Sequence, residues 1–71
     1  MAEEYHIMTL TVQEATERLR AMGVRISPDT LRDGIRQNIF PFGDHIETKA
    51  GNPVYLIYEK LFNQWAAQRA Q

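Results

Sequence analysis

Apolar residues recur at helical spacing in the first third of the chain and form a single stripe: Val12, Ala15, Leu19 and Met22. This spacing predicts an amphipathic helix over 12–22. Thr11 stands where an N-cap belongs, and Glu14, three residues later, completes a capping-box pattern. Gly23 follows the stripe and can take the left-handed conformation that ends a helix. The start and the end of this first helix are therefore both encoded locally.

A second, shorter apolar stripe consists of Leu31 and Ile35 and predicts a helix over 28–38. Ser27 provides an N-cap side chain, and the proline after it suits the first helical position, where its missing N–H costs nothing. Gly34 lies inside this helix, where glycine costs about 1 kcal/mol relative to alanine. We expect another segment's backbone to approach the helix closely there. Two helices joined by so short a link predict a helix-turn-helix.

The pattern changes after the second helix, because Pro41 cannot continue it. Alternating and β-branched residues on either side of a polar, turn-forming tip predict a β-hairpin over 44–57. Apolar residues then return to helical spacing and predict a third helix over 58–69: Tyr58, Leu61, Phe62 and Trp65. The predicted fold class is mainly α with a small β-hairpin, in the order helix, helix, hairpin, helix. A short tail, 1–8, precedes this single domain, 9–69.

The total charge of the chain argues against a generic nucleic-acid binder. The 71 residues include 8 Lys+Arg and 9 Asp+Glu, for a net charge of −1 and a pI near 6.0, whereas a pI above about 9 is typical of nucleic-acid-binding domains. The charge is uneven, however. Residues 1–17 carry four glutamates and no base, whereas residues 18–36 carry five arginines against two aspartates, and residues 37–71 balance. One face of the helix-turn-helix can therefore be basic although the total is near neutral.

Several classes of function are disfavoured by what the sequence lacks. The chain has no cysteine, which removes disulfides, thiolate metal sites and cysteine nucleophiles. His6 and His45 are far apart in the sequence and have no carboxylate at ligand spacing, so we expect no metal site. Without a phosphate loop or a nucleophile elbow, and with little room for a substrate pocket, we expect neither an enzyme nor a cofactor. No apolar run reaches the roughly 18 residues of a membrane span and the start is acidic, so we expect a cytoplasmic protein.

Two blocks of the sequence resemble the excisionase-like helix-turn-helix family, which is related to MerR-type winged helices. The first block is the run Leu-Thr-Val-Gln-Glu-Ala over 10–15, and the second extends over 26–41. The positions that match the family's pattern are Leu10, Thr11, Val12, Glu14, Ala15, Ser27, Thr30, Leu31, Ile35, Arg36, Phe40 and Pro41. The resemblance covers about residues 9–67, and the order of elements agrees. It implies a winged helix-turn-helix, with a two-stranded wing and a closing helix.

Four positions of the second helix region depart from the family's pattern, among them Pro28, where a basic or small polar residue is common. Asn38 replaces a usual glycine, and asparagine also accepts a left-handed backbone. Asp29 and Asp33 stand where polar or basic residues are common, and the hairpin lacks a frequent arginine pair. These differences lower the positive charge of the surface that would face DNA. They predict modest affinity, with help from self-association on DNA or from a recombinase or other phage protein.

The resemblance implies a small, sequence-specific DNA-binding protein of a prophage or mobile element, acting as an excisionase-like or transcription-regulatory factor. By analogy, the 28–38 helix enters the major groove of double-stranded DNA and the 44–57 hairpin is the wing. Arginine can bond guanine bidentately or clamp a phosphate, and hydroxyl and amide groups also bond phosphates and base edges. The residues that we expect to contact DNA are Arg25, Ser27, Thr30, Arg32, Arg36, Gln37, Lys49 and Asn52.

Ordinary structural roles stay open for several of these residues. Arg32 and Arg36 can pair with Asp29 and Asp33 on a solvated helix face, and Ser27 can serve only as the N-cap. The alternative function is a protein-interaction adaptor on the same fold, such as a terminase or recombination accessory module, with weak or no autonomous DNA binding. The near-zero net charge and the aspartates of the second helix favour this alternative. Neither interpretation involves a membrane or a small-molecule substrate.

Overall fold

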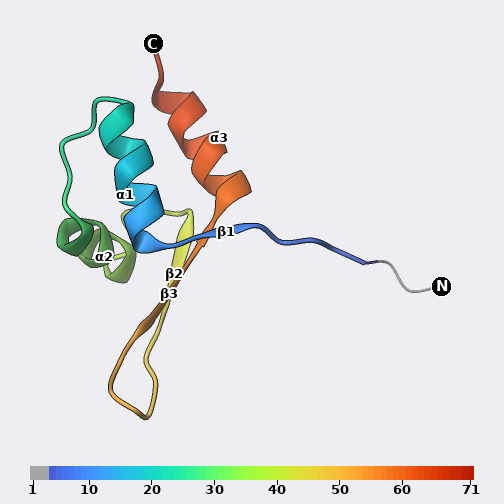
Figure 1. The fold of residues 1–71 in the computed structure, drawn as a ribbon, viewed down its shortest axis with the longest axis vertical. Coiled ribbons are helices and arrows are strands. Elements are labelled where there is room, and N and C mark those ends of the chain that lie inside the picture. Colours follow the sequence, from blue (N-terminus) through green and yellow to red (C-terminus); the bar gives the residue numbers. More distant parts are fainter. Residues whose placement is uncertain (1–3) are drawn as a thin grey trace.

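Residues 4–71 are described in a computed structural model, in which three helices pack with a three-stranded antiparallel sheet (Figure 1). In chain order the elements are β1 (Thr9–Leu10), α1 (Val12–Ala21), α2 (Pro28–Arg36), β2 (Gly43–Ile46), β3 (Val54–Tyr58) and α3 (Glu59–Arg69). The small, helix-rich α+β class that the sequence predicts is confirmed. The strand β1 is an addition that the sequence pattern does not predict. Part of the predicted tail, residues 1–3, lies outside the described residues.

The helix α1 begins with the predicted capping box. The Thr11 side-chain oxygen accepts a hydrogen bond from the Glu14 backbone N–H at 3.0 Å, and the Glu14 carboxylate accepts one from the Thr11 backbone N–H at 2.9 Å. This second bond favours the charged carboxylate and lowers the pKa of Glu14. The helix ends one residue earlier than predicted, with Met22 as its C-cap, and Gly23 follows at a φ of +97°. The predicted left-handed glycine is therefore confirmed.

The helix α2 ends two residues before the predicted boundary. Its last helical residue is Arg36, and Gln37 is the C-cap. Asn38 takes a φ of +59°, in the left-handed region, and its N–H bonds to the carbonyl of Ile35 at 3.1 Å. The helix cannot continue through this conformation, although the sequence pattern extends to residue 38. Asparagine tolerates this left-handed backbone better than most residues other than glycine.

The glycine inside α2 is explained by a side chain and not by a backbone. A Cβ placed on Gly34 would lie 2.3 Å from Cε2 of Phe40 and 2.5 Å from its Cδ2. The prediction that another backbone approaches Gly34 is therefore wrong, because the neighbour is the Phe40 side chain. The expected lack of space for a side chain at position 34 is confirmed. The Phe40 ring is held by Phe42, with ring centroids 5.2 Å apart, and by Trp65, with centroids 5.7 Å apart.

The sheet has the order β1–β3–β2, so β3 is its central strand. β2 pairs with β3 from Gly43 opposite Ile57 to Ile46 opposite Val54, and β1 pairs with the other edge of β3. The hairpin is thus one residue longer at each end than the predicted 44–57. Tyr58 ends β3 and is not helical, so α3 begins at position 59. The Tyr58 hydroxyl donates to the Asp44 carboxylate at 2.9 Å, which raises the pKa of Tyr58.

The hydrophobic core lies between the three helices and the sheet. Its buried residues come from every helix and from the sheet region: Leu10, Ala15, Leu19, Leu31, Ile35, Phe42, Ile57 and Phe62. Three residues of the predicted apolar stripes are outside it, since Tyr58 is half-buried, Met22 is 51% exposed and Leu61 is 42% exposed. Met22 follows the last turn of α1 and so misses the buried face. Thr16 is buried instead, with its hydroxyl donating to the Val12 carbonyl at 2.8 Å.

Candidate nucleic-acid interface

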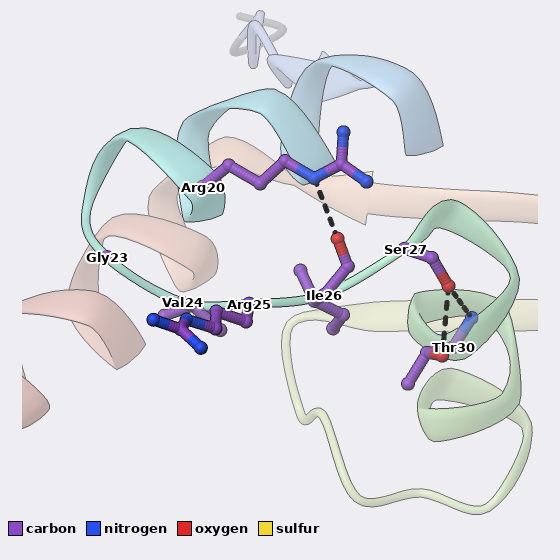
Figure 2. Close-up of a pocket in the computed structure, with 7 residues that line it drawn as sticks. All are labelled: Arg20, Gly23, Val24, Arg25, Ile26, Ser27 and Thr30. Carbon is purple, nitrogen blue, oxygen red and sulfur yellow. Dashed lines mark hydrogen bonds between the residues drawn. The ribbon is translucent and has the colours of Figure 1, made fainter.

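Two open surface grooves contain six of the eight residues that the sequence singles out for DNA contact. The first, here called the turn groove, follows the link between α1 and α2 (Figure 2). It is lined by Arg20, Gly23, Val24, Arg25, Ile26, Ser27 and Thr30. The second, here called the helix–hairpin groove, lies where α2, the start of α1 and the hairpin meet. It is lined by Thr11, Val12, Gln13, Arg32, Arg36, Asn52, Pro53 and Tyr55.

Ser27 and Thr30 form one hydrogen-bonded unit at the start of α2. The Ser27 hydroxyl oxygen accepts from the Thr30 backbone N–H at 3.2 Å, so Ser27 is the N-cap. The two hydroxyl oxygens are 3.0 Å apart and share a hydrogen bond. The structural role that the sequence left open for Ser27 is therefore present. Both hydroxyls also line the turn groove, where a ligand can reach them.

The shape of the turn depends on a residue that sequence reasoning did not select. The Arg20 Nε donates to the Ile26 carbonyl at 2.9 Å, which ties the last turn of α1 to the end of the link (Figure 2). This bond leaves the terminal guanidinium nitrogens of Arg20 without a hydrogen bond to the described residues. Arg20 belongs to the arginine-rich segment over 18–36. Its position near the end of the predicted first helix favours an interaction with the helix dipole over a DNA contact.

Arg25 gives the turn groove a second cation. Its side chain is exposed and makes no hydrogen bond or ion pair with residues 4–71. Figure 2 shows it toward the α1 side of the turn, whereas Ser27 and Thr30 lie at the α2 side. None of the residues that line this groove is acidic. The two arginines and two hydroxyls that line this groove are groups that bond phosphate oxygens.

Arg32 and Arg36 lie together in the helix–hairpin groove, one turn apart on α2. Arg32 Nη1 is 2.9 Å from the Asp29 carboxylate, and Arg36 pairs with Asp33 in the same way. The arginine side chains are 39% and 46% exposed, and their aspartate partners are more exposed still. Exposed pairs of this kind are worth about 0–1 kcal/mol. Each arginine can therefore exchange its aspartate for a phosphate or a base edge at little cost.

The hairpin supplies the opposite wall of the helix–hairpin groove. The backbone carbonyl of Asn52 accepts a hydrogen bond from the Thr48 hydroxyl at 2.8 Å across the tip of the hairpin. The side-chain amide of Asn52 makes no hydrogen bond to residues 4–71. Tyr55 is the second residue of β3, and the centroid of its ring lies 5.3 Å from that of His45. Tyr55 is half-buried and packs against the core, as the sequence predicts, and it also lines this groove. Tyr55 and Ile57 are two residues apart on β3 and share a face of the sheet, so the strand pattern could not show that Tyr55 also borders a groove.

The remaining two predicted residues stay outside both grooves. Gln37 is the exposed C-cap of α2, at the end of the helix that lies far from the turn. Lys49 is exposed at the tip of the hairpin. Gln13, in contrast, lines the helix–hairpin groove and bonds to the Glu17 carboxylate at 3.1 Å. Gln13 belongs to the first helix and not to the helix that the resemblance places in the major groove, so sequence reasoning did not select it.

Within residues 4–71, no helix is long and apolar enough to cross a membrane. No group of three His, Asp or Glu side chains in the same range could hold a metal ion. No protein-family model, curated protein or solved structure matches the chain. The interpretation of the two grooves therefore depends on their own geometry and charge.

Proposed function

We propose that this chain is a winged helix-turn-helix protein that binds double-stranded DNA, with α2 in the major groove and the β2–β3 hairpin as the wing. One observation carries the proposal: Arg32 and Arg36 of α2 line the same groove as Asn52 of the hairpin. The major groove is about 12 Å wide and admits one α-helix. A helix with two arginines on its open face, next to a projecting hairpin (Figure 1), suits that space.

The distribution of charge supports the same assignment. The segment over 18–36 carries five arginines, and four of them line one or other of the two grooves: Arg20, Arg25, Arg32 and Arg36. Phosphate contacts by such groups hold a protein on DNA, and contacts to base edges select the sequence. The turn groove suits phosphates because its hydroxyls and cations are exposed. The helix–hairpin groove suits base edges because Arg32 and Arg36 come from the helix that would enter the duplex.

The cellular role that we propose follows from the resemblance of the sequence to excisionase-like proteins. It is excision or transcriptional regulation for a prophage or mobile element, in the cytoplasm. The aspartates beside Arg32 and Arg36 predict modest affinity for DNA by a single copy. Binding at repeated sites, or together with a recombinase, would raise that affinity through multivalency.

The proposal is tested by measuring the affinity of the full chain for a random duplex at about 50 and about 200 mM salt. Roughly five phosphate contacts predict a fall in affinity of about 10²–10³-fold between these conditions. Failure to bind at the lower salt, at high protein concentration, would overturn autonomous DNA binding. A footprint that shows full affinity for one isolated half-site would contradict the need for a second copy or a partner.

A protein-interaction adaptor is the second candidate function, and a specific observation favours it. Several large apolar side chains of the described residues are exposed, among them Ile39 at 62% and Met22 at 51%. Met22 and Val24 line one apolar groove, and contiguous exposed apolar surface marks sites of protein interaction. Under this assignment, the affinity for random DNA would be weak and would not respond to Arg32 or Arg36. The same titration therefore separates the two candidates.

A further inference from the structure

The residues before β1 form an extended arm, Glu4–Met8, that leaves the body of the protein. Its base is fixed, because the Met8 carbonyl accepts a hydrogen bond from the Glu59 backbone N–H at 3.0 Å. Beyond this point Figure 1 shows the arm pointing away from all three helices. Ile7 is 69% exposed and Met8 is 52% exposed, and neither belongs to the core. The arm thus presents two large apolar side chains to solvent.

An apolar groove lies at the other end of the molecule, between the end of α1 and the second half of α3. This end groove is lined by Leu19, Met22, Val24, Trp65, Ala66, Arg69 and Ala70. Its volume is about 190 Å³, and a cavity of about 150 Å³ is enough for a benzene-sized group. Arg69 is its one charged residue. The Arg69 guanidinium lies 4.3 Å from the centre of the Trp65 ring and donates to the Trp65 carbonyl at 3.2 Å.

We infer that the arm of one copy docks in the end groove of a second copy of this chain. The two surfaces are complementary in polarity, because Ile7 and Met8 are apolar and so are the groove walls. They are also complementary in charge, because the arm carries a glutamate and no lysine or arginine, whereas the rim of the groove carries Arg69. Glu4 is the described acidic residue of the arm and stands three positions from Ile7.

The geometry favours a second copy over the arm's own groove. The arm leaves beside the first residue of α3, whereas the groove lies about seven residues further along that helix, roughly 10 Å away at 1.5 Å per residue. The arm also points in the opposite direction (Figure 1). Such a contact is either exchanged reciprocally in a twofold dimer or repeated head to tail. Because few side chains take part, we expect the interface to bury less than the roughly 1,200 Å² of a stable complex and association to depend steeply on concentration.

This inference concerns an interface and does not rest on DNA binding. The absence of cysteine allows it to be tested by directed crosslinking between two single-cysteine variants. We would mix Ile7→Cys protein with Ala66→Cys protein under mild oxidation and measure the mixed disulfide. Ala67→Cys is the matched control, because Ala67 is the next residue on α3 and is exposed outside the groove. Several-fold more mixed disulfide with the cysteine at 66 than at 67 is expected. Equal yields, or a disulfide only within a chain that carries both cysteines, would overturn the inference.

Sedimentation velocity over a range of concentrations provides a second readout that needs no crosslink. Ala66→Glu should abolish the concentration-dependent species, and Ala67→Glu, with the same change in charge, should leave it. Glu4→Arg should weaken association, and combining it with Arg69→Glu should restore it. A purely monomeric wild type at the highest soluble concentration would contradict the inference, and so would identical behaviour of the 66 and 67 variants. Circular dichroism of each variant establishes that it is folded.

Discussion

The ring of Phe40 lies where a side chain at position 34 would have to go, since a Cβ placed on Gly34 would be 2.3 Å from the Phe40 ring. The ring cannot move aside easily, because Phe42 stacks on it and the Trp65 edge faces it. The Gly34 carbonyl also accepts the Ile39 N–H at 2.9 Å, which fixes the chain after α2. Through this contact the exit of α2 is locked to the aromatic cluster that supports the hairpin.

Gly34→Ala should therefore destabilise the protein although alanine is the better helix former. The gain in helix propensity is about 1 kcal/mol, and overpacking a filled site typically costs about 1–3 kcal/mol and occasionally more. We expect a net loss of about 1–2 kcal/mol in the free energy of unfolding, measured from urea midpoints. Adding Phe40→Ala should make the Gly34→Ala change neutral or favourable. A stabilised Gly34→Ala single variant would show that the ring yields.

The capping box predicts a specific pH dependence of stability. Because the Thr11 N–H bonds to the Glu14 carboxylate, the pKa of Glu14 is lower in the folded state than in the unfolded state. The stabilisation is therefore present above the ordinary glutamate pKa and is lost as the pH falls through the lowered one. Urea midpoints between neutral and acidic pH should fall less in Glu14→Gln than in wild type. Parallel curves for the two proteins would contradict this role, and Glu17→Gln is the matched control.

The local signals in the sequence correctly predict the elements whose ends are set by neighbouring residues. The Thr11–Glu14 box and Gly23 fix both ends of α1 within one residue. The sequence misses β1, because a strand of only two residues exists through its pairing with β3, more than forty positions away. It also places Met22 and Leu61 inside the core, since periodicity does not say how far along a helix the neighbouring layer extends.

Helical spacing predicts part of the site, and the path of the hairpin and the turn decides the rest. The spacing of Arg32 and Arg36 places them on one face of a helix, and the structure puts both in one groove. The amphipathic pattern could not show that Asn52 and Tyr55 form the opposite wall, because that depends on where the hairpin folds back. The bond from Arg20 to the Ile26 carbonyl likewise depends on the path of the turn.

Arg20→Lys isolates the positioning role of Arg20, because the charge is kept and the Nε donor is lost. Losing one exposed hydrogen bond should cost about 0.5–1.5 kcal/mol of stability and loosen the turn before α2. We expect the affinity for random duplex DNA to fall several-fold, with backbone amide shifts confined to the link. Arg18→Lys is the matched control on the same helix. Equal affinities of the two variants would assign Arg20 a role in charge alone.

Asp33→Asn should strengthen DNA binding under the proposed function. The substitution frees Arg36 from its partner and removes a negative charge that would face phosphates. Because such a surface pair is worth about 0–1 kcal/mol, the affinity for random duplex should rise about two- to fivefold. Glu17→Gln gives the same change in net charge on α1 and should have a smaller effect. Unchanged or weaker binding by Asp33→Asn would favour the adaptor role.

The most direct test of the proposed function is the salt dependence of DNA binding by Arg32→Ala/Arg36→Ala. If both arginines contact phosphates, the slope of log affinity against log salt should become shallower by about 1–2. Lys60→Glu changes the net charge by the same amount, and Lys60 lies on α3 outside both grooves, so its slope should stay close to that of wild type. A folded double variant that keeps the wild-type affinity and slope would show that α2 does not face DNA.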